Sequence, residues 1–422
     1  MPKTVFVFPG LGSQYVGMVK SFYDQFEVAR QTFEEASDIL GYPLDKVCFE
    51  GSLSELSKPE IIQPALLTTN VAMFRAFMEE IGVRPSFSCG HSLGEYAALT
   101  CAGAIRFADA VAIVNKRGLI TSALIQRSIG TMTILDQVNP RKFEKECSRI
   151  SSEGRVVSIS CYNSPNQVAI SGEMDAVEEI EEICLNHDGQ VTPLFMSAPM
   201  HSILMEKAAL EFREELGKHT YYPFKWPVLS NVTGRPYAQP EQIADLLAKQ
   251  MYMPVEWQST ISYLLKYGVN TSIEIGPKNV LSKLIGESNP NIKSLCYGTK
   301  EERQTIKELF NETGFCKTSP TVISKCLAAV AATPNKNWNV EEYNKGVVEP
   351  YRKLQFIQET LEKENAKPTV MQMREALNLL QLIFETKRVS EKERNDCIHH
   401  ILDYTGNYYM LTEQKDAVLS KN

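Results

Sequence analysis

Residues 88–99 read SCGHSLGEYAAL and place one serine, Ser92, between Gly90 and Gly94. A short strand pattern precedes the serine, and an apolar run typical of a helix follows it. A nucleophilic serine on a strand-to-helix turn needs small flanking residues, and the helix behind it directs its N-terminal amides at the same place. The pattern fits such a nucleophile, but taken alone it fits a helix N-cap serine equally well.

The composition indicates an ordinary globular chain and limits its partners. The 422 residues are 43% hydrophobic and 23% charged, with a formal net charge of -7. Acidic and basic residues are interleaved, so we expect no nucleic-acid partner. The ten cysteines lack metal-ligand or disulfide spacing, which predicts no metal site and fits a reducing cytoplasm. No apolar segment approaches the roughly 20 residues that span a bilayer, and the chain start does not match a signal peptide. We therefore expect a cytoplasmic protein with no membrane partner.

Strand and helix patterns alternate around the serine turn. Residues 4–8 (TVFVF) match a buried strand that ends in the turn PGLGSQ, and residues 22–40 match a helix. Residues 64–82 match a second helix, with Pro64 in its first turn and Gly82 at its C-terminal end. This alternation predicts an α/β-hydrolase-like domain, in which helices cover a parallel sheet.

Two further regions differ from this pattern. Residues 130–197 follow the order β-α-β-β-α-β, which predicts an inserted ferredoxin-like α+β subdomain. After residue 314 strand patterns stop, and three capping-box patterns begin helices; they start at Asn339, Thr369 and Ser390. Residues Met373, Leu377, Leu380 and Phe384 lie on one helical stripe. We therefore predict an α/β core at 1–129 and 198–316, the subdomain at 130–197, and a helical C-terminal extension at 317–422.

The motifs GHSLGE (90–95) and FPGLGSQ (8–14) together resemble those of the malonyl-CoA:acyl-carrier-protein transacylases. The resemblance covers residues 1–314 and extends to the discrete, trans-acting acyltransferases of polyketide synthases. It implies that Ser92 is acylated while malonyl moves from malonyl-CoA to an acyl carrier protein, without a cofactor. The family's oxyanion hole uses two backbone N–H groups, here those of Leu93 and Leu11. Leu11 replaces a family glutamine, which keeps the backbone donor but loses the side chain.

A nucleophilic serine also needs a base, and His201 is the candidate. It precedes a helix pattern, and a helix N-terminus favours the neutral imidazole that a base requires. The resemblance places the family base here and implies that a backbone carbonyl at Gln250 orients it, giving a Ser-His dyad. His91 is too close in sequence to turn back onto Ser92, so we expect it to pack beside the site. A lone histidine is otherwise more often a hydrogen-bonded core residue.

Arg117 falls on the apolar stripe of a helix pattern, in line with Ala110 and Val114. A buried guanidinium needs a partner, and an internal glutamate is the usual one. The resemblance implies instead that Arg117 binds the free carboxylate of malonyl, a bidentate contact that lysine would not reproduce. It also assigns substrate binding to Gln63.

Five other positions carry weaker expectations. Asn163 and Asn231 match lesser polar positions of the family, or simply hold turns. Met200 fills the space of an α-methyl branch and so favours malonyl over methylmalonyl by about 1–3 kcal/mol, or it only packs the core. Glu256 and Lys278 depart from the family, which often has arginine and glycine there; we expect both to lie outside the dyad.

Two other classes of function stay open at this point. One is a hydrolase, either with a late histidine such as His399 or as a proofreading member of the same family. The other is a non-catalytic scaffold whose C-terminal extension binds a partner. The extension favours a trans-acting role in polyketide or mixed polyketide–peptide synthesis, and an acidic carrier protein would require a local basic patch near the site.

Overall fold

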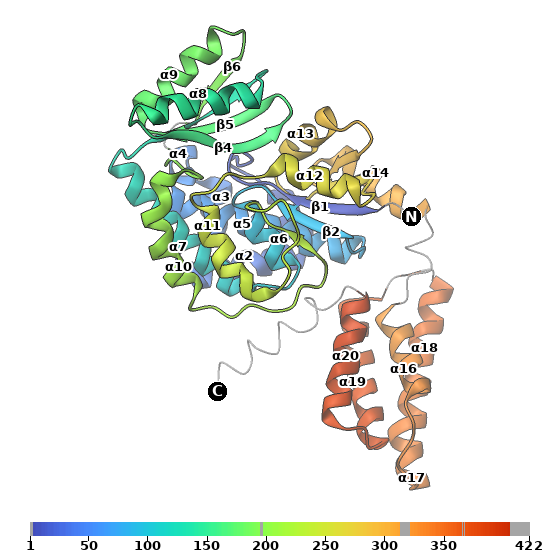
Figure 1. Cartoon of the computed structure of the whole chain (residues 1–422). Coiled ribbons are helices and arrows are strands. Elements are labelled where there is room, and N and C mark those ends of the chain that lie inside the picture. Colours follow the sequence, from blue (N-terminus) through green and yellow to red (C-terminus); the bar gives the residue numbers. More distant parts are fainter. Residues whose placement is uncertain (1–2, 195–196, 313–320, 365, 367, 406–422) are drawn as a thin grey trace. The chain divides into compact units, whose positions relative to one another are not determined.

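The computed structural model describes residues 3–194, 197–312, 321–364, 366 and 368–405. The chain divides into two compact units: residues up to 76 together with 85–306, and residues 77–84 together with those from 307 onward. The first unit contains two sheets, and the second is helical (Figure 1). No helix among the described residues combines the length and apolar character needed to cross a membrane.

The larger sheet of the first unit is parallel and carries the serine turn. Every paired strand in it runs in the same direction. Both faces of such a sheet are covered by helices, which explains why all five residues of its central strand are buried. Its strands, in spatial order, are β7 (Val228–Leu229), β2 (Phe87–Gly90), β1 (Thr4–Phe8), β8 (Thr271–Glu274) and β9 (Lys293–Cys296).

Helices flank this sheet, and two of them differ from the sequence prediction. The predicted helix at 22–40 is two helices, because Phe26 adopts extended backbone (φ -115°, ψ 122°) and stacks on Phe22 at 5.9 Å. Pro64 lies inside its helix rather than in the first turn, since Pro59 takes the first helical position. The helices are α1 (Lys20–Gln25), α2 (Glu27–Leu40), α3 (Leu44–Glu50), α4 (Leu53–Leu56), α5 (Pro59–Glu80), α6 (Gly94–Cys101), α7 (Phe107–Gln126), α10 (Glu206–Leu216), α11 (Ile243–Gln250), α12 (Trp257–Lys266), α13 (Val280–Ser288) and α14 (Lys300–Glu312), with 3-10 turns at Ile203–Met205 and Pro240–Gln242.

The second sheet is the predicted ferredoxin-like subdomain. Its strands and helices are β3 (Thr131–Asp136), α8 (Pro140–Ser152), β4 (Val157–Ser164), β5 (Gln167–Gly172), α9 (Met174–Leu185) and β6 (Gln190–Pro193). The sheet is antiparallel with the order β4-β5-β3-β6. Helices α8 and α9 lie beside this sheet (Figure 1). Their apolar residues, including Phe143 and Ile180, share one core with Leu135 and Val168 of the strands. The predicted fold class is therefore confirmed.

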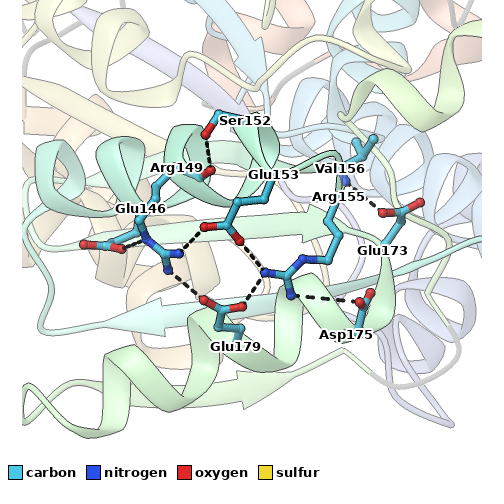
Figure 2. A network of polar contacts seen from close by, with 9 residues as sticks. All are labelled: Glu146, Arg149, Ser152, Glu153, Arg155, Val156, Glu173, Asp175 and Glu179. Carbon is cyan, nitrogen blue, oxygen red and sulfur yellow. Dashed lines mark hydrogen bonds and ion pairs between the residues drawn. The ribbon is translucent and has the colours of Figure 1, made fainter.

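A solvent-side network of ion pairs joins the two helices of this subdomain. Figure 2 shows Arg149 of α8 between Glu146, Glu153 and Glu179, and the last of these lies on α9. Arg155 bonds Glu153 and Glu179 as well, so both arginines share two carboxylates. Single exposed pairs contribute little, but shared partners hold these side chains in one arrangement. The network therefore links α8 to α9.

The helical unit has its own apolar core. Its elements are α16 (Val322–Ala332), α17 (Val340–Tyr343), the π-turn η3 (Asn344–Val348), α18 (Glu349–Glu364), α19 (Val370–Thr386) and α20 (Glu391–Thr405). The predicted stripe on α19 faces this core. Thr369 and Ser390 form reciprocal capping boxes. Asn339 caps α17, but the Glu342 carboxylate accepts from Asn337 instead of closing the third box.

Candidate active site

Ser92 lies on a sharp turn between β2 and α6. Its backbone is left-handed, with φ at 50°, a conformation that L-residues adopt only when the surroundings impose it. A Cβ at Gly90 would lie 1.9 Å from the Gly94 carbonyl carbon, and one at Gly94 would lie 1.9 Å from Phe8 O. Neither glycine can therefore be replaced without moving the turn, as a nucleophile elbow requires.

The Ser92 side chain faces a histidine and does not cap the helix. Its Oγ lies 2.8 Å from His201 Nε2. The N-cap residue of α6 is Leu93, and no side chain caps that end. The structure therefore favours the nucleophile interpretation of this motif over the capping interpretation.

His201 is held in one orientation by backbone groups. The ring atom Nδ1 lies 2.6 Å from the Gln250 carbonyl oxygen, and the backbone N–H of His201 donates to Met251 O at 2.8 Å. Because Nδ1 faces an acceptor, it carries the proton, and Nε2 is left to accept from the serine. The imidazole is 2% exposed.

The protonation state of His201 follows mainly from burial. Burial lowers its pKa to about 3, and the positive charge of Arg117 contributes in the same direction. The helix N-terminus expected from the sequence is not the cause, since a 3-10 turn at Ile203–Met205 separates His201 from α10. His201 is therefore neutral at physiological pH.

The backbone N–H groups of Leu93, which follows Ser92, and of Leu11, which follows Gly10, have no hydrogen-bond acceptor among the residues that the structure describes. Gly10 keeps the space beside Leu93 open, since a Cβ there would lie 3.4 Å from Leu93 N and 2.5 Å from His91 O. The N–H of Ser92 itself is occupied, because it donates to Asn231 Oδ1 at 2.6 Å. The Leu11 side chain is 49% exposed.

Both predicted asparagines support the turn. The Asn231 carboxamide bridges it, accepting from Ser92 N and donating to Gly90 O at 2.6 Å. Asn163 Oδ1 lies 2.8 Å from His91 Nε2, and the His91 ring packs edge-on against Trp257. His91 is thus a packing residue that ties the turn to the ferredoxin-like subdomain.

Arg117 extends from α7 and is 1% exposed. Its Nη1 donates to Gln63 Oε1 at 2.8 Å, and its guanidinium lies over the Tyr96 ring at 5.6 Å. By geometry its Nε and Nη2 have no hydrogen-bond partner, and none of the ion pairs among the described residues includes it; Tyr96 and Glu95 interact with it electrostatically. Burial lowers the pKa of the guanidinium. The structure thus pairs Arg117 with a neutral amide and shows no internal glutamate on it.

Met200 is buried beside this group. Thr121 Oγ1 donates to the Arg117 carbonyl oxygen at 2.8 Å and lies 4.0 Å from Met200 Sδ. Of the two departures from the family pattern, the Glu256 carboxylate accepts from Ser259. Lys278 Nζ lies 3.4 Å from Gly12 O, so it contacts the turn that carries Leu11.

The sequence prediction missed a buried carboxylate. Glu95, in the first turn of α6, is fully buried and accepts hydrogen bonds from Tyr237, Gln250 and Asn231. An acidic residue in a first helical turn is ordinarily explained by the helix dipole, so its position alone gave no signal of this role. No group of three or more His, Cys, Asp or Glu within the described ranges is placed to hold a metal ion.

Comparisons with known proteins give the family of the chain. Residues 5–295 match the acyl transferase domain family. A curated Bacillus subtilis protein named malonyl CoA-acyl carrier protein transacylase is 34% identical over 399 residues, covering 93% of this chain and 99% of that protein. A solved FabD from Acinetobacter baumannii has a TM-score of 0.70 and 34% identity, and covers 74% of this chain and 99% of its own. A solved malonyl-transacylase, in complex with a type II PKS acyl-carrier protein, has a TM-score of 0.69 and 35% identity; it covers 73% of this chain and 99% of its own.

Proposed function

Because the chain belongs to the malonyl CoA-acyl carrier protein transacylase family, we propose that it transfers malonyl from malonyl-CoA to the phosphopantetheine thiol of an acyl carrier protein. The transfer passes through a malonyl ester on Ser92. The observation that carries this proposal is the 2.8 Å contact between Ser92 Oγ and the neutral His201 Nε2. A hydroxyl beside a neutral, oriented imidazole is the arrangement that nucleophilic acyl transfer needs.

In the first half-reaction, Ser92 Oγ attacks the thioester carbonyl carbon while its proton passes to His201 Nε2. The C–S bond then breaks, His201 returns the proton to the departing sulfur, and free CoA leaves. In the second half-reaction, the carrier thiol gives its proton to His201 and its sulfur attacks the ester carbonyl carbon; the C–O bond to Ser92 then breaks, and the proton returns to Ser92 Oγ. The Gln250 carbonyl holds Nδ1–H throughout and stabilises the imidazolium that forms twice.

The negative charge of each tetrahedral intermediate falls on the former carbonyl oxygen. The N–H groups of Leu93 and Leu11 are the donors that we assign to it. Each such donor typically lowers the barrier by about 2.7–4 kcal/mol. Since both are backbone donors, the replacement of the family glutamine by Leu11 leaves them in place.

We assign the distal carboxylate of malonyl to Arg117, with Gln63 fixing the guanidinium. The two unpartnered nitrogens of Arg117, Nε and Nη2, support this assignment. A planar carboxylate accepts from two nitrogens at once, and it supplies the charge that the buried cation lacks. Met200, beside Thr121, is the residue that we expect to disfavour an α-methyl branch.

We further propose that the enzyme acts in trans on carriers of polyketide or mixed polyketide–peptide synthesis in the cytoplasm. The match of the Bacillus subtilis relative over 93% of this chain supports a role for the helical extension, which lies beyond the 74% that FabD covers. Separate apolar cores in residues 135–184 and 322–401 support the three-part division proposed from the sequence. Nine cysteines of the described residues are free thiols, which fits the reducing compartment.

Intact-mass measurement tests the central step. Purified protein mixed with malonyl-CoA is expected to gain the mass of one malonyl group, which holo carrier protein then removes. Ser92→Ala is expected to gain none, whereas Ser54→Ala, at an exposed serine of α4, keeps the adduct. Release of free malonate at the rate of carrier loading would indicate the hydrolase alternative, and an unmodified wild type would refute the proposal.

A further inference from the structure

Glu95 is a carboxylate with no access to water and no cation bonded to it. It is 0% exposed, and three donors surround it: Tyr237 Oη and Gln250 Nε2, each at 2.6 Å, and Asn231 N at 3.2 Å. Burial raises its pKa to about 7, and hydrogen bonds from these donors oppose that shift. Burying such a group is costly, so a benefit elsewhere in the structure is expected.

One of the three donors connects Glu95 to the base. Gln250 Nε2 donates both to Glu95 Oε2 and to Ser92 O at 2.9 Å, while the backbone carbonyl of the same residue accepts from His201 Nδ1. Gln250 is the last residue of α11 and is completely buried. Its side chain thus ties the residue that orients the histidine to the turn that carries the nucleophile.

We propose that Glu95 is a positioning residue for acyl transfer, which holds the Gln250 side chain so that the Gln250 carbonyl keeps His201 aligned with Ser92. This inference rests on the proposed function, since it concerns the same dyad. Glu95 touches neither the serine hydroxyl nor the imidazole in the contacts described, so it acts through Gln250. Misplacing reacting groups by about 1 Å can slow a reaction about 100-fold, which gives such a tie a measurable effect.

The other two contacts of Glu95 allow a purely structural explanation. Tyr237 and Asn231 lie on the segment that follows β7, so Glu95 could merely anchor that segment to α6. The two explanations differ in what they require of Gln250. A positioning role requires that removing the Gln250 side chain has the same effect as removing Glu95, whereas an anchoring role makes Tyr237 the more sensitive residue.

The test is a set of variants assayed for the single-turnover rate of Ser92 malonylation over a range of malonyl-CoA concentrations. Glu95→Met and Gln250→Met keep unbranched side chains of similar length, but each removes the hydrogen bond between Gln250 Nε2 and Glu95 Oε2. Each is expected to lower the saturated rate about 10- to 100-fold, with the half-saturating concentration changed less than about threefold. The double variant is expected to be no slower than the slower single one, because the two residues act as one unit. Tyr237→Phe, the matched control, is expected to stay within about threefold of wild type.

Each other outcome overturns the inference. Wild-type rates in both single variants, or losses that multiply in the double variant, show that Glu95 does not act through Gln250. A Tyr237→Phe rate as low as that of Glu95→Met shows an anchoring role. If Glu95→Met does not fold, Gln250→Met decides alone, and an undiminished rate refutes the positioning role. In all these cases wild type still forms the Ser92 adduct; its absence in wild type would instead remove the proposed function itself.

Discussion

Replacing Arg117 is expected to separate malonyl transfer from acetyl transfer. Two of its nitrogens have no partner in the structure, and each would donate one charge-assisted hydrogen bond to the malonyl carboxylate. Such bonds contribute about 1.5–3 kcal/mol each. Arg117→Ala is therefore expected to remove about 3–6 kcal/mol of transition-state stabilisation, which lowers kcat/KM for malonyl-CoA about 100- to 10,000-fold.

Arg117→Lys tests how much of the effect comes from the pair of donors and how much from the charge. A lysine keeps the charge but not the planar pair of donors, so about one of the two bonds is lost and the decrease is about 10- to 100-fold. Acetyl-CoA has no distal carboxylate, so its transfer is expected to change only a few-fold in either variant. Arg127→Ala, at an exposed position that ends the same helix, is the matched control and is expected to behave as wild type.

The assay is transfer of radiolabelled acyl groups from each CoA thioester to a holo carrier protein, with initial rates for both substrates. Circular dichroism and thermal unfolding show whether the variants are folded. Equal losses for malonyl and acetyl would refute the reasoning, because they would mean that Arg117 supports the site and does not select the substrate. An Arg117→Lys variant as active as wild type would refute the two-bond geometry.

Two further predictions concern pH. Burial keeps the pKa of His201 near 3, so the imidazole is neutral at every working pH and is expected to cause no acid limb in the rate of Ser92 malonylation from pH 8 down to about pH 5. Because burial also raises the pKa of Glu95 to about 7, the measurement uses Glu95→Met, and quenched-flow rates of that variant that fall near pH 6.5 would contradict the prediction. Burial also raises the pKa of Glu274 to about 7, so between about pH 4.5 and 7 the folded protein holds a proton that the unfolded chain has released, and wild type loses stability as pH rises. Glu274→Gln lacks this loss, so its stability relative to wild type is expected to improve by about 3 kcal/mol across that range. Urea unfolding of both proteins at both pH values measures their free energies of unfolding. An equal change with pH in wild type and Glu274→Gln would disprove the prediction.

The features predicted correctly from the sequence are those that local sterics determine. The serine turn needs Gly90 and Gly94 because their Cβ positions are filled by the backbone of the turn itself and of β1. The strand at 4–8 and the six elements of the ferredoxin-like subdomain follow from periodicity in short windows. The interruption at Phe26 does not follow from periodicity; its ring contacts a residue distant in sequence, since the Arg303 guanidinium lies 5.1 Å from it.

The site divides in the same way. The motif around Ser92 makes it a candidate nucleophile but leaves the N-cap interpretation open, whereas the pairing of His201 with Gln250 spans 49 residues and is predicted only through the resemblance to a family. The Glu95 contact with Tyr237 spans 142 residues. Nothing in the GHSLGE motif distinguishes a glutamate that faces solvent from one that is buried among three donors. Polar contacts between residues this far apart in sequence can be identified only from the three-dimensional structure.

The buried Arg117 guanidinium and the neutral, weakly basic imidazole of His201 are electrostatically linked. The positive charge of Arg117 disfavours an imidazolium at His201 and so contributes to its lowered pKa. If Arg117 binds the malonyl carboxylate as proposed, that carboxylate offsets the charge, and proton transfer from Ser92 to His201 is expected to become easier when malonyl is in place. An acetyl group brings no such charge, and it therefore leaves the base as weak as it is in the free enzyme. Removal of Arg117 likewise removes the charge that lowers the pKa of His201. Acetyl transfer is therefore expected to survive the substitution, while malonyl transfer does not.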